Sequence, residues 1–218
     1  MFKFLKAALL SLILLAAPLN ARNETQKRLY DATVVLFAHP SYGEWLPFCS
    51  GSVIYQNTET THVLTAAHCI VDERREFRYH AVYVGRWPYD GWKVKARPLL
   101  ISNLTAGLDF AVIEFETVET LPVLKPAPAP LTIGTSIVAI GAPGGIAKLY
   151  LRGVIAAVNQ DTNLWGGVAF AQLPDVGPGF SGGPVICGED ICGIVVGQLR
   201  TNPDIVAIEP ISVLQVSE

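Results

Sequence analysis

The run GPGFSGGPV at residues 177–185 is the stretch of this sequence best suited to chemistry. It places Ser181 among four glycines and two prolines. Glycine lacks a Cβ and tolerates positive φ, so a loop of this kind exposes a hydroxyl and lets a substrate backbone come close. Its N–H groups can also converge on one point, as an oxyanion-binding site requires. The pattern favours a nucleophilic serine, with an ordinary surface turn as the alternative.

A serine nucleophile needs a base within hydrogen-bond reach and a group that orients the base. His68 lies in TAAHC (65–69), a small-residue turn that follows an apolar stretch and ends in a cysteine. Asp109 opens the apolar run DFAVI (109–113). We expect Asp109 to orient His68, and His68 to activate Ser181. The alternatives are a structural histidine and an ordinary turn aspartate.

The order of these residues along the chain excludes one rival. Residues 179–183 (GFSGG) also satisfy the Gly-x-Ser-x-Gly nucleophile elbow of α/β-hydrolases, in which the catalytic histidine follows the serine. All four histidines of this chain lie between residues 39 and 80 and so precede Ser181. A lipase or esterase of that fold is therefore excluded.

Short strands, rather than helices, must position these groups. From about residue 30 the sequence alternates between stretches rich in Val, Ile, Leu and aromatic residues and breaks of Gly, Pro, Asn and Asp. No long segment after residue 21 shows a sustained helical period. This pattern predicts an all-β fold. The expected strands are residues 32–37, 52–55, 62–64, 81–85, 93–101, 110–115, 136–140, 149–158, 167–172, 184–187, 193–197 and 205–208.

A proline-rich linker at residues 121–131 divides the expected strands into two groups of six. We therefore predict two six-stranded antiparallel β-barrels. The first spans residues 22–120 and carries His68 and Asp109. The second spans residues 132–218 and carries the serine. The crevice between the barrels is the expected active site, because ligand sites often lie between domains.

The first 21 residues have the order of a secretory signal peptide. Two lysines precede an apolar run at residues 7–17, and the segment ends in a small residue, Ala21. Cleavage after Ala21 predicts a secreted or periplasmic protein, with an uncleaved membrane anchor as the alternative.

Export affects how the four cysteines are interpreted. An even set is able to pair fully in an oxidising compartment, and three connectivities are open. We favour Cys49 with Cys69, and Cys187 with Cys192. A zinc site is disfavoured because the sequence has no Cys-x2-Cys pair. We expect neither a metal nor a cofactor.

Composition narrows the expected partners. The net charge is −3 over 218 residues, and no long run of Lys or Arg occurs, so nothing suggests nucleic-acid binding. We expect a protein or peptide substrate, and no membrane contact after signal cleavage. The oligomeric state is left open.

The motifs together resemble those of the chymotrypsin/trypsin-like serine proteases, whose triad runs in the order His, Asp, Ser. CSGSVI (49–54) resembles the segment before the catalytic histidine, and TAAHC the histidine motif. DFAV (109–112) resembles the aspartate motif, and residues 179–184 resemble the serine motif. The resemblance implies the double-barrel fold of that family and a serine endopeptidase that works through an acyl-enzyme. A catalytically silent binding protein of the same fold is the alternative.

The second half is most similar to compact bacterial members of the HtrA type. AIGAPGG (139–145) resembles their glycine–proline turn, GVI (153–155) the strand after it, and VAIEP (206–210) their last strand. We expect a member without a PDZ domain.

The resemblance also implies roles for single residues. His68, Asp109 and Ser181 would form the triad. The N–H groups of Gly179 and Ser181 would form the oxyanion hole. The Cys49–Cys69 bridge matches one that many members carry beside the histidine. An extended substrate would pair as an added strand with Val195, Val196, Gly197 and Gln198.

Two positions depart from the family's pattern. Phe180 stands where animal members carry the aspartate that pairs with a new N-terminus, so we expect no activation by N-terminal insertion. Trimming of a prosegment between Arg22 and Tyr30 stays open. Asp175 stands six residues before the serine, where trypsin-like members carry the acid that selects Arg or Lys. Asp175 is therefore a candidate substrate-binding residue, with an exposed loop acid as the alternative.

Overall fold

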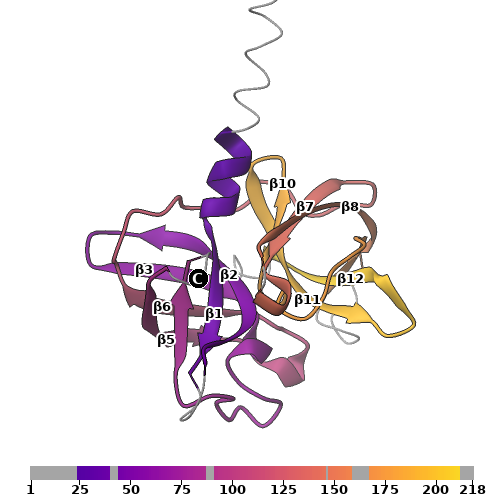
Figure 1. The fold of residues 1–218 in the computed structure, drawn as a ribbon. Coiled ribbons are helices and arrows are strands. Elements are labelled where there is room, and N and C mark those ends of the chain that lie inside the picture. The colour runs from indigo at the N-terminus through magenta and orange to yellow at the C-terminus, as the bar shows by residue number, and fades with distance from the viewer. Residues whose placement is uncertain (1–23, 40–43, 87–90, 146, 159–166, 212–218) are drawn as a thin grey trace, which may run out of the picture.

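The computed structural model describes residues 24–39, 44–86, 91–145, 147–158 and 167–211. The predicted signal peptide lies outside these ranges. Two β-barrels lie side by side, the first drawn in indigo to magenta and the second in orange to yellow (Figure 1). The prediction of an all-β double barrel is confirmed.

The first barrel closes in the order β1-β2-β3-β6-β5-β4, with antiparallel neighbours throughout. Its strands are β1 (Thr33–Ala38), β2 (Leu46–Gln56), β3 (Thr60–Thr65), β4 (Val82–Gly85), β5 (Lys93–Ile101) and β6 (Ala111–Glu116). The second barrel closes in the order β10-β11-β12-β9-β8-β7, again antiparallel. Its strands are β7 (Ser136–Gly141), β8 (Leu149–Val158), β9 (Ala169–Gln172), β10 (Pro184–Cys187), β11 (Asp190–Leu199) and β12 (Asn202–Pro210).

All twelve expected strands are present, because alternating apolar side chains bury one face of each strand. In β6, buried residues alternate with half-buried ones from Ala111 to Phe115. The structure also lengthens several strands beyond the sequence pattern. β2 begins at Leu46 instead of residue 52, and β11 and β12 extend at both ends. Backbone pairing with a neighbour sustains these extensions where the apolar pattern stops.

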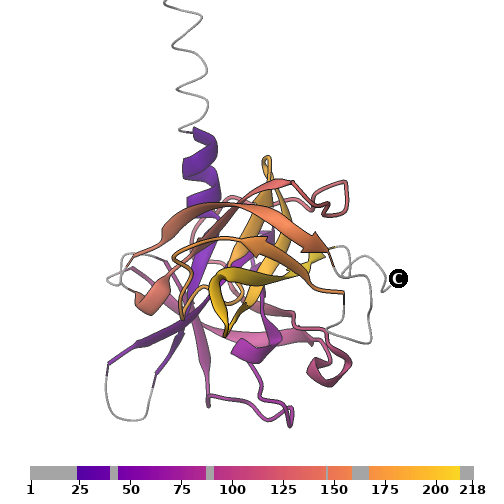
Figure 2. The same ribbon diagram turned by 90° about the vertical axis from the view of Figure 1, so that its right-hand side faces the viewer.

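Apolar side chains form part of the contact between the barrels. Four isoleucines on the strands of the second barrel belong to the same buried cluster as the core of the first barrel. They are Ile140, Ile186, Ile191 and Ile194. The quarter-turn view looks onto the second barrel, drawn in orange to yellow (Figure 2). Burial of this surface fixes how the barrels are oriented, and therefore how residues from each meet at the site.

The proline-rich stretch is bonded to both barrels. The N–H of Leu124 donates to the carbonyl oxygen of Val53 in the first barrel at 2.9 Å. Ala127 and Lys125 then bond to the backbone of Ile191 in the second barrel, at 2.8 and 2.9 Å. The connector therefore makes backbone contacts with both barrels.

A helix at residues 24–31 was not predicted. It is short and mostly polar, its Leu29 is buried in the core cluster of the first barrel, and two of its side chains bond to the other half of the chain. Thr25 Oγ1 and Arg28 Nη2 donate to Glu189 in the β10–β11 turn, at 3.2 and 3.0 Å. None of the helices in the described ranges combines the length and apolarity that crossing a bilayer requires.

A buried lysine joins the chain after this helix to the second barrel. Lys148 is 6% exposed, and its Nζ donates to the carbonyl oxygens of Tyr30 and Thr33, the latter at 2.9 Å. The Nζ also lies 3.9 Å from the centroid of the Tyr30 ring. Burial lowers the pKa of Lys148 to about 7.

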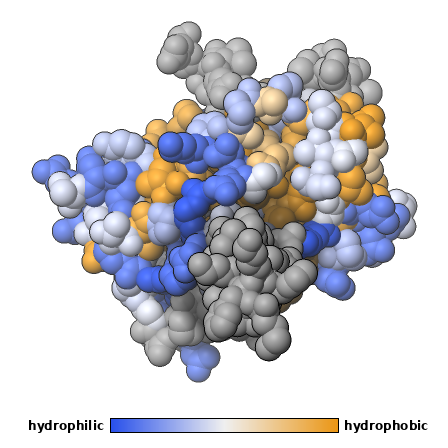
Figure 3. All heavy atoms as spheres, turned by 90° about the horizontal axis from the view of Figure 1, so that it is seen from above, coloured by the Kyte–Doolittle hydropathy of each residue, from blue (hydrophilic) through white to orange (hydrophobic). Residues whose placement is uncertain are grey.

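Seen from above, hydrophobic residues gather mainly on the side of the second barrel (Figure 3).

Both favoured disulfides are present. Cys49 and Cys69 join β2 to the turn that follows β3. Cys187 and Cys192 close the hairpin between β10 and β11. No cysteine in the described ranges is free. The predicted pairing is therefore confirmed.

Candidate active site

His68 lies on a 3₁₀ turn, Ala67–Cys69, directly after β3. Ala66 and Ala67 are fully buried, so the turn packs closely on the first barrel because its side chains are small. The disulfide to Cys49 fixes the end of the turn to β2. The His68 side chain itself remains 29% exposed, so a substrate is able to reach it.

Asp109 holds His68 with both carboxylate oxygens. Oδ1 accepts the backbone N–H of His68 at 2.9 Å, and Oδ2 lies 2.6 Å from the ring Nδ1. A carboxylate at Nδ1 favours the tautomer with its proton on Nδ1, which leaves Nε2 able to accept a proton. The Asp109 side chain is 19% exposed, so solvent competes little for this bond. The structure thus brings together two of the three predicted triad residues in the expected geometry.

Ser102 orders the segment that presents Asp109. Its hydroxyl donates to the carbonyl oxygen of Leu108 at 2.8 Å and accepts the N–H of Phe110 at 2.9 Å. One buried hydroxyl therefore holds the residues on either side of Asp109, which points the carboxylate at the histidine turn.

The serine loop needs glycine at two positions. Gly179 has φ +106° and Gly182 has φ +78°, a conformation that side-chain-bearing residues rarely adopt. A Cβ on Gly182 would lie 2.1 Å from Thr65 Oγ1 and 2.4 Å from the carbonyl oxygen of Ser50. A Cβ on Gly179 would lie 2.4 Å from the carbonyl oxygen of Ala142. The glycines therefore let the loop lie directly against both barrels.

Ser50, which the sequence did not single out, fixes the serine loop to the first barrel. Its hydroxyl donates to the carbonyl oxygen of Gly179 at 2.7 Å and accepts the N–H of Ala142 at 3.0 Å. Its backbone N–H donates to the carbonyl oxygen of Ser181 at 2.8 Å. Ser50 is fully buried, so these bonds are protected from water. A small polar residue next to Cys49 in an otherwise buried strand was the available signal.

Ser181 lies beside the histidine turn. Its carbonyl oxygen is 3.8 Å from the Sγ of Cys69, the residue after His68. No hydrogen bond between Ser181 Oγ and His68 Nε2 is formed among the described contacts; such bonds often tighten only when substrate binds. Within the described part of the chain, the N–H groups of Gly179 and Ser181 have no protein acceptor, whereas that of Phe180 donates to Gly177.

The residues predicted to pair with substrate lie on β11. The N–H of Val195 donates to the carbonyl oxygen of Gly183, and its own carbonyl oxygen accepts the N–H of Gly182, so both main-chain groups of Val195 are used inside the protein. Gly197 and Gln198 lie at the half-buried to exposed end of β11 and pair on one side with β12. A role for residues 195–198 in binding substrate stays a prediction.

Asp175 and Phe180 lie in the loop that leads to the serine. Asp175 is exposed and has φ +65°, typical of a turn residue. Gln198 braces this loop, because its Nε2 donates to the carbonyl oxygens of Val176 and Pro203, the latter at 3.2 Å. A role for Asp175 in selecting substrates stays a prediction. Phe180 is fully buried against Gly141, within the core of the second barrel.

A carboxyl of the second barrel lies behind Asp109. Glu209 is 2% exposed, and its Oε2 accepts the backbone N–H of Asp109 at 3.3 Å. Burial raises the pKa of Glu209 to about 7, and the negative charge of Asp109 acts in the same direction. The sequence signal was an acid inside the apolar strand VAIEP.

Three potential metal-binding atoms cluster at the site. The ligand atoms of Cys49, His68 and Cys69 lie within 4.8 Å of one another. Both sulfurs are joined in a disulfide and so offer no thiolate to a metal.

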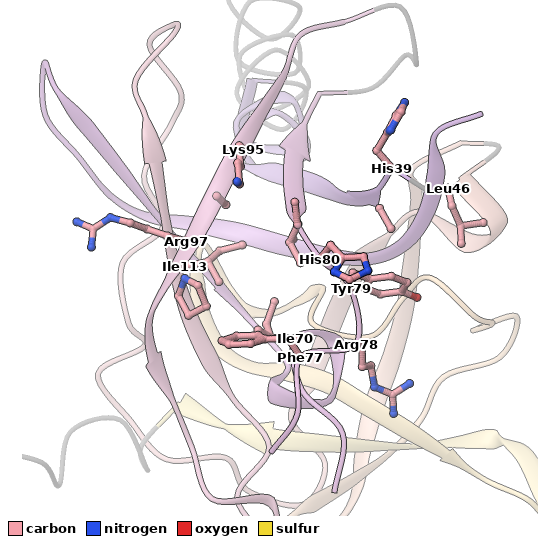
Figure 4. A pocket seen from close by; sticks show the side chains of 15 residues that line it. His39, Leu46, Ile70, Phe77, Arg78, Tyr79, His80, Lys95, Arg97 and Ile113 are labelled. Atoms are coloured by element: carbon pink, nitrogen blue, oxygen red, sulfur yellow. The ribbon is translucent and has the colours of Figure 1, made fainter. Parts of the chain in front are cut away.

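A cavity of about 720 Å³ opens on the first barrel, and its lining includes Ile70, the residue after Cys69. The buried Ile70 and Ile113 line it together with the exposed Phe77, and basic side chains such as Lys95 and Arg97 also line it (Figure 4). None of the predicted site residues lines it. The predicted triad residues come from both barrels, His68 and Asp109 from the first and Ser181 from the second.

Known proteins share this architecture. A family model of the trypsin-like peptidase domain matches residues 49–197, and no curated protein matches the chain by sequence. The serine endoprotease from Yersinia pestis superposes with a TM-score of 0.67 at 20% identity, covering 88% of this chain and 63% of that chain. The active form of the Rv3671c protease from M. tuberculosis gives 0.67 at 20% identity, covering 88% and 81%. The HtrA-type protease AlgW, with a tripeptide, gives 0.68 at 19% identity, covering 88% and 60%.

At these identities the structural likeness shows the fold alone, and the chain spans less than two thirds of the Yersinia and AlgW chains. The family match is broader evidence, because it covers most of the chain and includes His68, Asp109 and Ser181. Together with the fold it supports a serine protease. The chain belongs to the trypsin-like peptidase domain family.

Proposed function

We propose that this protein is an exported serine endopeptidase that cleaves peptide bonds through His68, Asp109 and Ser181. Ser181 Oγ attacks the scissile carbonyl as His68 Nε2 takes its proton, and an acyl-enzyme forms as the amine leaves with that proton. Water then attacks the acyl-enzyme as His68 Nε2 takes its proton. The carboxylic acid leaves as that proton returns to Ser181 Oγ. Asp109 remains ionised and stabilises the imidazolium form of His68.

The observation that carries this proposal is the double hydrogen bond between Asp109 and His68. A histidine used only for packing has no need of a carboxylate on both its ring and its backbone. The bonds fix the ring orientation and the tautomer before substrate arrives. A binding protein without catalysis gains nothing from this arrangement, so it favours the enzyme over the silent alternative.

The serine loop supports the same reaction. The N–H groups of Gly179 and Ser181, which lack protein acceptors in the described ranges, are suited to bind the oxyanion of the tetrahedral intermediate. The buried Phe180 between them supports assembly of the loop without a salt bridge to a new N-terminus. Residues 196–198 provide the edge along which an extended peptide would pair.

Export rests on the signal-like residues 1–21, and the two disulfides agree with an oxidising compartment. Proteolysis of protein or peptide substrates would then take place outside the cytoplasm. No cofactor or metal is required, because the triad and the backbone N–H groups supply each step.

A fluorophosphonate probe, which reacts covalently with activated serines, tests this function without a known substrate. We expect labelling of the wild-type protein and none of Ser181→Ala. Ser136→Ala is the matched control, since Ser136 is an exposed serine at the start of β7 and its loss leaves labelling unchanged. Folded wild-type protein that resists the probe would favour the silent binding protein.

A further inference from the structure

Glu209 is placed where its carboxyl acts on the triad from the other barrel. It lies on β12, whereas Asp109 precedes β6. Its Oε2 accepts the Asp109 N–H, and its Oε1 is buried with no hydrogen-bond partner among the described residues. Nothing in the reaction proposed above uses this group. Burying a carboxyl with a single hydrogen bond lowers the stability of the fold, so the position of Glu209 calls for an explanation.

The bond from Glu209 differs from the others that hold this segment. The carbonyl oxygen of Leu108 and the backbone N–H and carbonyl oxygen of Phe110 are all bonded to Ser102, within the first barrel. The N–H of Asp109 alone, among the described backbone bonds of residues 108–110, is bonded to the second barrel. Glu209 therefore links the barrel that carries Ser181 to the residue that orients His68.

We propose that Glu209 is a positioning residue of the triad: as a neutral carboxylic acid it holds the backbone of Asp109. When Glu209 ionises, it makes the activity depend on pH through a group outside the triad. This inference rests on the function proposed above. Asp109 and His68 touch each other and act on the reacting atoms, whereas Glu209 acts only through Asp109.

The surroundings of Glu209 favour its neutral form. The side chains packed around it from β3, the Asp109 segment, β11 and the chain after β12 are apolar: Leu64, Phe110, Ile194 and Ile211. In the described ranges the titratable group that faces it is Asp109, and His68 is the next group along the hydrogen bonds. Burial, with the charge of Asp109, raises the pKa of Glu209 to about 7.

Ionisation of Glu209 adds a second negative charge beside the Asp109 carboxylate. This charge stabilises the imidazolium form of His68, because opposite charges attract strongly in a poorly hydrated site. Two coupled groups release their protons over a broader range of pH than one group does.

Two substitutions separate position from charge. Glu209→Gln keeps an oxygen that accepts the Asp109 N–H and has no charge at any pH, so it imitates the neutral acid. Glu209→Leu has neither the acceptor nor the charge. Glu114→Gln is the matched control: Glu114 is a partly buried glutamate on β6 whose partners, His62 and Arg97, lie away from the site.

The readout is the rate of labelling by the fluorophosphonate probe between about pH 5 and about pH 9. In wild type we expect a broad rise with pH. In Glu209→Gln we expect a rise that fits one ionisation, with its midpoint lower by on the order of half a pH unit. Glu209→Leu keeps this lower midpoint, and its plateau rate falls roughly tenfold because Asp109 loses its anchor. The control follows wild type.

A merely structural Glu209 gives a different result: both variants lose thermal stability, and their labelling profiles keep the wild-type midpoint and width. That result overturns the inference while Ser181-dependent labelling leaves the proposed function intact. Absence of labelling in wild type overturns both. Infrared spectroscopy of wild type tests the inference even if the variants fold poorly. At about pH 5 wild type should show the carbonyl band of a buried neutral acid, and it should lose this band by about pH 9. A band that does not change with pH also overturns the inference.

Discussion

Adding a methyl group at Gly182 tests whether close contact between the serine loop and the first barrel sets the geometry of the site. A Cβ there would lie 2.1 Å from Thr65 Oγ1, 2.4 Å from the carbonyl oxygen of Ser50 and 2.8 Å from the backbone N of Ala66. The threonine hydroxyl is able to rotate away only by giving up its bond to Ser50. The other two atoms belong to the backbone and are not able to rotate away. The loop must therefore move.

The structure gives the size of both effects. The left-handed φ of +78° costs an alanine about 1 kcal/mol relative to glycine. Overpacking against the two backbone atoms adds about 1–3 kcal/mol. Ordinary contact begins near 3.4 Å, so the loop must shift by roughly 1 Å, a displacement that typically costs about 100-fold in rate. We expect Gly182→Ala to lose about 2–4 kcal/mol of stability and about 100-fold in labelling rate.

Gly188→Ala is the matched control. Gly188 also has a left-handed φ, +69°, but a Cβ there meets nothing within 4 Å. We expect this variant to lose only about 1 kcal/mol and to label as wild type does. Urea unfolding measures the first quantity and the rate of fluorophosphonate labelling the second. A Gly182→Ala protein that matches Gly188→Ala in both would refute the argument from contact.

Three further outcomes are expected. Ser50→Ala removes the bonds to Gly179 and Ala142 and should lower stability by about 1–2 kcal/mol, measured by urea unfolding, and slow fluorophosphonate labelling. Glu209→Gln should remove a pH dependence of stability. Folded wild type holds one more proton than its unfolded chain between about pH 4.5 and about pH 7, so its stability falls over that range by about 3 kcal/mol. Urea titrations measure this fall, and equal slopes against pH in the two proteins would contradict the prediction. If Asp175 selects Arg or Lys, Asp175→Ala should lose that preference in a peptide panel; an unchanged panel shows that it is only a loop acid.

The fold was largely accessible from the sequence because its signals are local. Strand periodicity needs only neighbouring residues, so all twelve strands were located, and the prolines at residues 121–131 separated the barrels. The histidine and serine motifs are likewise local, because the alanines and glycines that form each turn are adjacent in the sequence to His68 and Ser181. Four cysteines allow only three pairings, and the favoured one is confirmed.

The missed features depend on partners that are remote along the chain. The helix at residues 24–31 is docked on Glu189, more than 150 residues away, and its own sequence is too short and polar to predict it. The start of β2 at Leu46 follows from pairing with β1, not from apolar alternation.

The sequence by itself determined which residues were available for the chemistry: a histidine in a tight turn, an acid before a buried strand and a serine among glycines. Only the tertiary structure decided what holds them. Ser50 reaches Gly179 across 129 residues, and Glu209 reaches Asp109 across 100. A buried hydroxyl or carboxyl is shown by its surroundings, and those surroundings exist only once apolar burial has pressed the two barrels together.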